Sequence, residues 1–286
     1  MPYAELNGIN IHYEVRGSGP PLLMMAPGGF DSTIEKWTTS GIWASVKPLE
    51  TLTNRYTCIA YDRREAGLSG GKVERVSWTT YAHEAKALLD LLNIPRAFLL
   101  GGCMGCSTAT AFAVAYPEST MGLVLHWPVG GVKWRQNGLE RFQQHVDFLK
   151  ANGLAAVVDL AREQGSFWVS PQAGPWASTI LSDPDFAANF ASQDQDRYLA
   201  MVGLMGQMLF DRDTATGPEP QELLALKVPV VIIPGADAAH ATSAARYLQE
   251  CLEGSLYHDV PVEEQTPDRV RQWIIEFLES HVTVAA

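Results

Sequence analysis

The run from Leu99 to Cys106 constrains the fold more than any other stretch of the chain. It reads LLGGCMGC, and it joins a short apolar strand to a helix of small residues. Gly101 and Gly105 stand two positions either side of Cys103. So tight a turn needs small residues at those positions, because larger side chains would meet the neighbouring strand or helix. The pattern is typical of a nucleophile elbow, which holds one side chain at the apex of a strand-to-helix turn.

The residue at this apex is a cysteine. Cys103 would lie just before a helix N-terminus, where backbone N–H groups and the helix dipole favour an anion and therefore the reactive thiolate. A plainer interpretation is a glycine-rich turn in which Cys103 is an inert, space-filling residue. Cys103 and Cys106 have CxxC spacing, so a redox role stays open. No second Cys or His pair follows at a matching interval, and we expect no metal site.

Composition bounds the class of protein. The chain has 286 residues, 47% of them hydrophobic, which suits one large α/β domain with an insertion. Its 21 Lys and Arg against 32 Asp and Glu give a net charge of −11, which argues against nucleic acid and anionic membranes as partners. We find no secretory leader or membrane-length apolar run and expect a cytoplasmic protein. Four scattered cysteines do not suggest a disulfide scaffold.

Short apolar strands alternate with amphipathic helices over most of the chain, and this pattern predicts a mostly parallel sheet covered by helices on both faces. The predicted strands comprise residues 4–15, as a pair broken at Asn7-Gly8, then 22–25, 56–61, 97–100, 122–126, 228–233 and 256–260. The main predicted helices begin near residue 78 and at residue 107, and a last helix includes residues 270–278.

The segment of residues 133–212 has a different pattern. It contains no predicted strand, is rich in Trp, Phe and Met, and is interrupted by Ser170-Pro171, Gly174-Pro175 and Asp183-Pro184. We therefore predict that it is a helical lid inserted between two parts of one core, residues 1–132 and 213–286.

The order of these parts resembles the α/β-hydrolase superfamily over residues 4–128 and from residue 228 onward. Residues 27–30, Pro-Gly-Gly-Phe, look like the family's His-Gly-x oxyanion loop. Residues 61–69 look like its Asp-x-Arg-Gly-x-Gly-x-Ser loop. The resemblance implies the α/β-hydrolase fold, with an eight-stranded, mostly parallel sheet and no cofactor.

The resemblance also implies an oxyanion hole formed by the backbone N–H groups of Gly29 and Met104. Two departures from the family pattern stand close to it. Pro27 replaces the usual histidine, which leaves no side chain there to brace the loop. Glu65 replaces the usual glycine beside the mouth of the site.

A thiol nucleophile in this fold is similar to that of the dienelactone hydrolases, whose triad is Cys-His-Asp. The similarity concerns the chemistry of the elbow alone. Thiolates attack activated acyl groups such as lactones, enol esters and thioesters, and they form an acyl-enzyme that is itself a thioester. An aspartate nucleophile would have implied dehalogenase or epoxide hydrolase chemistry, which Cys103 argues against.

The acid and the base are identified less directly. Asp237, in Gly-Ala-Asp, stands at the position of the family's acid, with Glu65 as an alternative. The family's base is a histidine in a loop after the last strand, and that loop is nearly absent here. His240 lies three residues after Asp237 at the carboxyl edge of the predicted sheet, so it is the preferred base. His258, His126 or no histidine at all remain as alternatives.

Aromatic residues predict the character of the pocket. Trp127 follows a core strand directly, and Trp168 belongs to a group of aromatic residues in the predicted lid. Arg64 and Glu65 are expected at the mouth of the site, where Arg64 would hold a carboxylate. These four residues predict a small-molecule substrate that is apolar or aromatic with one polar end.

Together these features predict a cofactor-free hydrolase that attacks an ester, lactone or thioester through Cys103, with His240 as base and Asp237 as acid. Two alternatives stay open: a C–C-bond hydrolase or lyase on the same fold, and a ligand-binding homologue without catalysis. The oligomeric state is open as well, a homodimer included.

Overall fold

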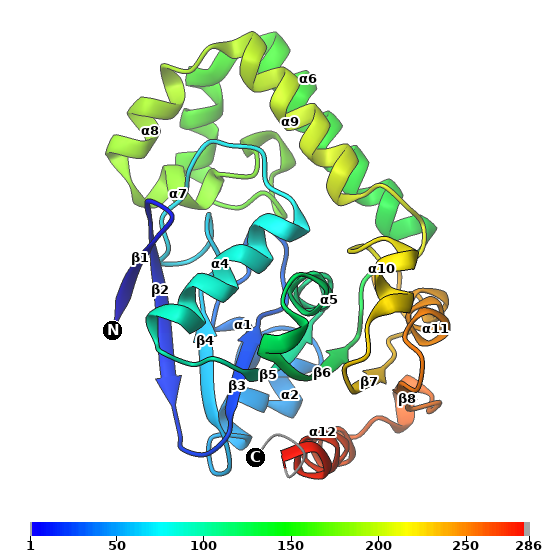
Figure 1. Ribbon diagram of the computed structural model, residues 1–286. Helices are drawn as coiled ribbons and strands as arrows, with labels where there is room; N and C mark the ends of the chain where they lie inside the picture. Colours follow the sequence, from blue (N-terminus) through cyan, green and yellow to red (C-terminus); the bar gives the residue numbers. More distant parts are fainter. Residues whose placement is uncertain (1, 283–286) are drawn as a thin grey trace.

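A sheet of eight strands forms the centre of the protein, shown in Figure 1 as a computed structural model that describes residues 2–282. The strand order is β1-β2-β4-β3-β5-β6-β7-β8, with β1, β2 and β4 paired antiparallel in that order and every other pair parallel. The predicted, mostly parallel eight-stranded sheet is confirmed. The strands are β1 (Tyr3–Leu6), β2 (Ile9–Arg16), β3 (Pro21–Met25), β4 (Thr57–Tyr61), β5 (Ala97–Gly102), β6 (Thr120–His126), β7 (Val230–Ile233) and β8 (Leu256–Tyr257).

Helices cover both faces of the sheet. Strand residues alternate between two hydrophobic clusters, so that Leu22 and Met24 of β3 contact one layer of helices while Leu23 and Met25 contact the other. The first layer consists of α1 (Lys36–Thr39), α2 (Trp43–Val46), α3 (Pro48–Thr51) and α12 (Pro267–Val282). The second consists of α4 (Trp78–Leu91), α5 (Gly105–Ala115), α10 (Pro220–Ala225) and α11 (Thr242–Cys251).

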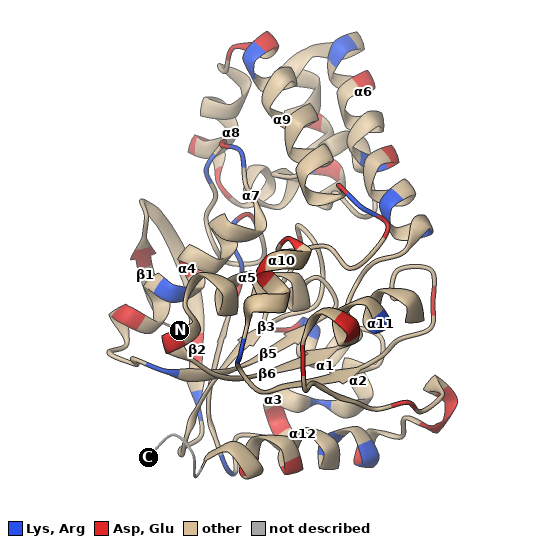
Figure 2. Ribbon diagram, turned by 45° about the vertical axis from the view of Figure 1, so that its right-hand side comes forward, with Lys and Arg blue, Asp and Glu red and all other residues tan. Residues whose placement is uncertain are grey.

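Burial on both faces explains why the central strands read as continuous apolar runs rather than as alternating ones. In Figure 2 the central strands β3, β5 and β6 contain no charged residue, whereas the outer strands β1 and β2 do. The start of α4 shows how a local sequence signal sets a helix boundary. Ser77 is the N-cap residue, and its side chain accepts a hydrogen bond from the Thr80 N–H (3.1 Å).

Residues 132–209, which lie between β6 and β7 in the chain, form a separate helical layer that we call the helical segment. It consists of α6 (Val132–Gln164), α7 (Ala177–Ser182), α8 (Pro184–Ala191) and α9 (Gln195–Leu209), and Figure 1 shows these helices together beyond α4 and α5. A non-helical residue, Gly153 (φ 82°), divides α6 into two parts. Between residues 2 and 282, no helix is both long and apolar enough to cross a membrane.

Candidate active site

The turn between β5 and α5 has the geometry of a nucleophile elbow. Cys103 has a positive φ of 55°, which is strained for a residue with a side chain. A Cβ added to Gly101 would lie 2.6 Å from the carbonyl oxygen of Gly105, and one added to Gly105 would lie 2.0 Å from that of Met25. Both glycines are therefore required by close backbone contacts. These contacts are the physical reason why the elbow pattern has glycine two positions either side of Cys103.

Cys103 differs from the other cysteines in its exposure. It is half-buried, whereas Cys58, Cys106 and Cys251 are buried, and all four thiols are free. Burial raises the pKa of Cys58 to about 12 and that of Cys106 well above its usual range. The Cys106 thiol also donates a hydrogen bond to the carbonyl of Gly101 (3.1 Å). Cys106 therefore has a structural position below the elbow.

Asp237 and His240 form a dyad within one short loop after β7. Nδ1 of His240 lies 2.8 and 2.9 Å from the two carboxylate oxygens of Asp237. One of these oxygens also accepts the backbone N–H groups of Ala239 (2.8 Å) and His240 (2.9 Å). Burial by itself raises the pKa of Asp237, but the hydrogen bonds from His240 and Ala239 lower it below its usual value. The carboxylate is thus held ionised against the ring.

The other ring nitrogen of His240, Nε2, is buried and has no hydrogen-bond partner within residues 2–282. Burial lowers the pKa of His240, but the interaction with Cys103 and then that with Asp237 raise it to about 9. Cys103 thus lies close enough to act on the imidazole, although no hydrogen bond of ordinary geometry joins the two side chains. The structure brings Cys103, His240 and Asp237 together.

The two other candidate histidines lie in different surroundings. His126 ends β6 with 0% exposure, and burial lowers its pKa to about 3. Its imidazole is therefore neutral over the physiological pH range and a weak proton acceptor. His258 follows β8 and stacks on Trp273 of α12, with ring centroids 4.1 Å apart. Of the three histidines that the sequence left open, His240 is the one placed between a thiol and a carboxylate.

Gln265 has a role that sequence reasoning missed. It lies in the loop between β8 and α12, where the family pattern places its histidine. Its side chain accepts a hydrogen bond from Nε1 of Trp127 (2.9 Å) and donates one to the carbonyl of Pro234 (2.8 Å). Trp127 is held in this way beside His240, with ring centroids 5.4 Å apart. The absence of a histidine from this loop in the sequence was the signal that could have drawn attention to Gln265.

The predicted oxyanion loop follows β3. Within residues 2–282, the backbone N–H groups of Gly29 and Met104 donate no hydrogen bond to another group, so both are free to receive a ligand. Trp168 of the helical segment covers this loop, because a Cβ added to Gly29 would lie 2.0 Å from its indole ring. The Arg141 guanidinium lies over the same indole, 4.6 Å from the ring centroid.

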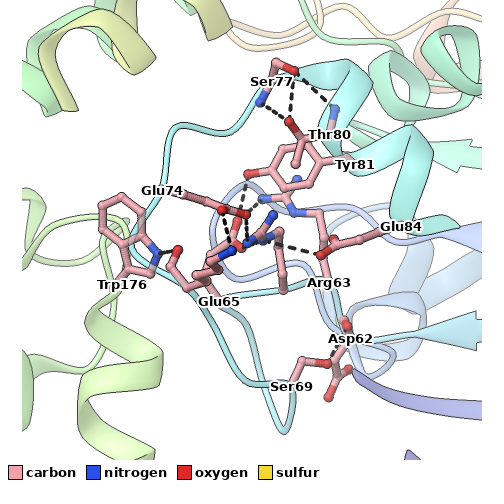
Figure 3. A network of polar contacts seen from close by, with 12 residues as sticks. Asp62, Arg63, Glu65, Ser69, Glu74, Ser77, Thr80, Tyr81, Glu84 and Trp176 are labelled. Carbon is pink, nitrogen blue, oxygen red and sulfur yellow. Dashed lines mark hydrogen bonds and ion pairs between the residues drawn. The ribbon is translucent and has the colours of Figure 1, made fainter. Parts of the chain in front are cut away.

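The positions of Arg64 and Glu65 correct one expectation. Arg64 is 2% exposed and Glu65 is 1% exposed, so neither stands at an open mouth where it would meet a substrate. Arg64 is paired with Glu65 (3.6 Å), Glu74 (2.6 Å) and Glu84 (3.4 Å). The Glu65 carboxylate accepts the hydroxyl hydrogen of Tyr81 (2.7 Å), as Figure 3 shows, and Asp237 is the carboxylate that contacts His240. The fold buries these charges in a network that the sequence pattern did not reveal.

Glu84 of this network predicts a pH-dependent stability. Burial raises its pKa to about 8, so it stays protonated in the folded chain while it ionises near pH 4.5 in the unfolded chain. The folded state then binds the extra proton, and its stability falls as the pH rises from about 4.5 to 8. We expect Glu84→Gln to gain unfolding free energy relative to the wild type across this range, by more than about 1 kcal/mol, since one pKa unit corresponds to about 1.4 kcal/mol.

Urea unfolding at several pH values between 5 and 8 measures this difference. The exposed Glu250 offers a matched control, and Glu250→Gln should show no such pH dependence. A Glu84→Gln curve parallel to that of the wild type would contradict the assignment.

A comparison with known families assigns the fold of the chain. The family described as alpha/beta hydrolase fold matches residues 21–237, which is more than half of the chain. The chain therefore belongs to the alpha/beta hydrolase fold family. The match ends at Asp237, three residues before His240.

Similar proteins were found by sequence and by structure. The chain is 28% identical over 158 residues to the uncharacterized hydrolase YraK of Bacillus subtilis (strain 168), covering 54% of this chain and 55% of that protein. It is 29% identical over 173 residues to the putative carbamate hydrolase RutD of Azorhizobium caulinodans, covering 60% and 59%. The chain thus spans little more than half the length of these curated relatives. The enol-lactonase from Burkholderia xenovorans LB400 shares the fold, with a TM-score of 0.62 at 19% identity over 97% of this chain and 100% of that one.

Proposed function

We propose that this protein is a cofactor-free hydrolase in which Cys103 attacks the carbonyl carbon of an ester, lactone or thioester. The observation that carries the proposal is the alignment of Cys103, His240 and Asp237. The thiol stands at the apex of a strained turn, and the imidazole beside it is held through its other nitrogen by a carboxylate at 2.8 Å. This is the arrangement of nucleophile, base and orienting acid that acyl transfer requires.

The proposed reaction has two halves. Cys103 gives its proton to Nε2 of His240, and its sulfur attacks the acyl carbon. The resulting oxyanion is held by the N–H groups of Gly29 and Met104, each of which contributes about 3 kcal/mol to such transition states. The imidazolium then gives its proton to the leaving oxygen or sulfur, and a thioester remains on Cys103. Water attacks this thioester, its proton passes through His240 to the sulfur, and the carboxylic acid is released.

The raised pKa of His240 supports the acid step. At about 9, it keeps the imidazole protonated at neutral pH when Cys103 is ionised, so a proton is available for the leaving group. The sequence likeness to a putative carbamate hydrolase also agrees with acyl chemistry.

The helical segment is proposed to act as the lid of this site. Trp168 from this segment covers Gly29, and Trp127 lies beside His240, so both walls next to the reacting groups are aromatic. Such walls favour an apolar or aromatic acyl group or leaving group. Arg64 is no part of the proposed substrate site.

The experiment uses p-nitrophenyl acetate, an enol lactone and an aryl thioester as probes. Cys103→Ala is expected to lose turnover of the probes by about 10³-fold or more, because no other group replaces the nucleophile. Cys106→Ala, which removes the buried neighbouring thiol, is the matched control and should keep most of the activity. Mass spectrometry of the wild type stopped during turnover should show an acyl group on Cys103.

Hydrolysis in labelled water separates the proposal from the alternatives. Solvent oxygen in the product acid is expected for hydrolysis, and product without solvent oxygen would indicate a lyase. Turnover that survives in Cys103→Ala would exclude the thiol mechanism.

A further inference from the structure

We propose that Arg63 positions the oxyanion loop, and that it replaces the brace missing at Pro27. The inference rests on the proposed function, since it concerns the hole that would hold the oxyanion beside Cys103. The Arg63 guanidinium donates a hydrogen bond through Nη2 to the carbonyl oxygen of Gly29, the residue whose own N–H group is proposed as an oxyanion donor.

Arg63 reaches this carbonyl from inside the protein. Its side chain is 4% exposed and its guanidinium lies 3.9 Å above the centroid of the Tyr81 ring and 5.7 Å from that of Phe30. The N–H of Ser32 also donates to the Gly29 carbonyl (3.3 Å). Both acceptor sites of this oxygen are thus occupied, which fixes the orientation of the planar peptide between Gly29 and Phe30. This peptide is the direct neighbour of the one that contains the Gly29 N–H group.

Glu65 holds Arg63 in place. One carboxylate oxygen of Glu65 lies 3.6 Å from Nη2 of Arg63 and accepts the Tyr81 hydroxyl hydrogen at 2.7 Å. Figure 3 shows Arg63, Glu65 and Tyr81 grouped in this way. A buried cation needs such a partner, because an unpaired charge would be strongly destabilising in the interior.

The backbone of Glu65 gives a second, independent indication. Glu65 has a positive φ of 59°, a conformation that favours glycine, and the family pattern has a glycine at this position. A strained residue with a buried charge persists only where its interactions compensate for both costs. Glu65 makes these interactions with Arg63 (3.6 Å), Arg64 (3.6 Å) and Tyr81 (2.7 Å). The two departures from the family pattern, at Pro27 and at Glu65, are therefore parts of one arrangement.

The network also connects the oxyanion loop with the helical segment. Nε1 of Trp176, which precedes α7, donates to the carbonyl of Lys72 (3.0 Å), in the same loop that contains Glu74 (Figure 3). Glu74 in turn pairs with Arg64 (2.6 Å). The network thus extends from the buried Arg64 through the partly exposed Glu74 to the loop that contacts the helical segment.

The test compares two reactions of the same sulfur. Acylation by p-nitrophenyl acetate passes through an oxyanion, whereas iodoacetamide is attacked at its methylene carbon with loss of iodide and forms no oxyanion. We expect Arg63→Met to slow acylation by about 10²-fold, in the range seen when an oxyanion donor is lost. Alkylation of Cys103 should stay within about twofold of the wild type. Arg63→Lys, which keeps the charge, should recover part of the acylation rate.

If Arg63→Met does not fold, Glu65→Gln provides a second test of the inference. It keeps a hydrogen-bond acceptor for Tyr81 but removes the charge that holds Arg63, and we expect acylation to slow by about 10-fold with alkylation unchanged. The exposed Arg96 gives the matched control, since Arg96→Met should leave both rates unchanged.

A parallel loss of acylation and alkylation in the Arg63 variants would show that Arg63 only stabilises the fold and would overturn the inference. Unchanged acylation would overturn it as well. Failure of the proposed function itself has a different signature, because acylation would then persist in Cys103→Ala whatever residue stands at position 63.

Discussion

His240→Gln is expected to slow the alkylation of Cys103 by iodoacetamide at pH 7 by about 10-fold or more, because the thiolate and not the thiol is the nucleophile. In the proposed mechanism the imidazole, whose pKa the interactions with Cys103 and Asp237 raise to about 9, takes the thiol proton. Without this base no side chain takes the proton of the Cys103 thiol, so less of the reactive thiolate forms. Mass spectrometry of the alkylated peptides measures the rate at each cysteine.

Two other histidine variants are the controls for this prediction. His126→Phe keeps a buried aromatic ring at a site where the imidazole is neutral, and His258→Gln changes a ring that stacks on Trp273. Both should leave the alkylation of Cys103 within about twofold of the wild type. A large loss in His126→Phe combined with no loss in His240→Gln would show that the wrong histidine has been assigned.

Under the proposed mechanism, the same dyad would determine the upper pH limit of hydrolysis. Below a pH of about 9 His240 carries the proton that the leaving group needs, and above it that proton is lost. Ester turnover should therefore fall above pH 9, while alkylation, which needs only the thiolate, should not. Buried Cys58 and Cys106 should remain unmodified in the folded protein.

Gly105→Ala is expected to destabilise the protein by about 3 kcal/mol. The added Cβ would lie 2.0 Å from the carbonyl oxygen of Met25 and 2.8 Å from its carbonyl carbon, so the backbone of β3 or α5 must move. The carbonyl oxygen of Ala26, at 3.1 Å, begins the oxyanion loop, and acylation of Cys103 should fall as well. Urea unfolding measures the free energy, and the p-nitrophenyl acetate assay measures the acylation.

Gly203→Ala is the matched control for this substitution. Gly203 lies inside α9, and a Cβ added there meets no atom within 4 Å. Because alanine is the better helix former, this change should stabilise the chain by about 0.5 to 1 kcal/mol. Similar effects of the two substitutions would contradict the tight packing of the elbow.

The sheet was largely predictable because each central strand is a short apolar run between loops. The predicted strand of residues 56–61 corresponds to β4 (Thr57–Tyr61), and the hairpin at Asn7-Gly8 joins β1 to β2. The last strand is shorter than predicted. The sequence pattern extends to residue 260, but β8 ends at Tyr257, and the chain turns away through Asp259 and Pro261.

The substrate-facing role expected for Arg64 and Glu65 was wrong for a physical reason. Both are charged residues in a loop at the correct edge of the sheet, which in sequence suggests exposure. The carboxyl groups that contact Arg64 are supplied in part by Glu74 and by Glu84 of α4, and only folding brings them there. Arg63, which sequence reasoning overlooked, contacts Gly29 across 34 positions of the chain.

The sequence by itself determined the features that depend on neighbours in the chain: the strand-turn-helix at Cys103, the alternation of strands and helices, and the short loop that contains both Asp237 and His240. These follow from the allowed backbone angles and from the periodicity of apolar residues. Only the tertiary structure decided which histidine meets the thiol, which charges are buried, and which side chain braces the oxyanion loop. Those outcomes depend on contacts between distant segments, and a local pattern contains no information about the partner.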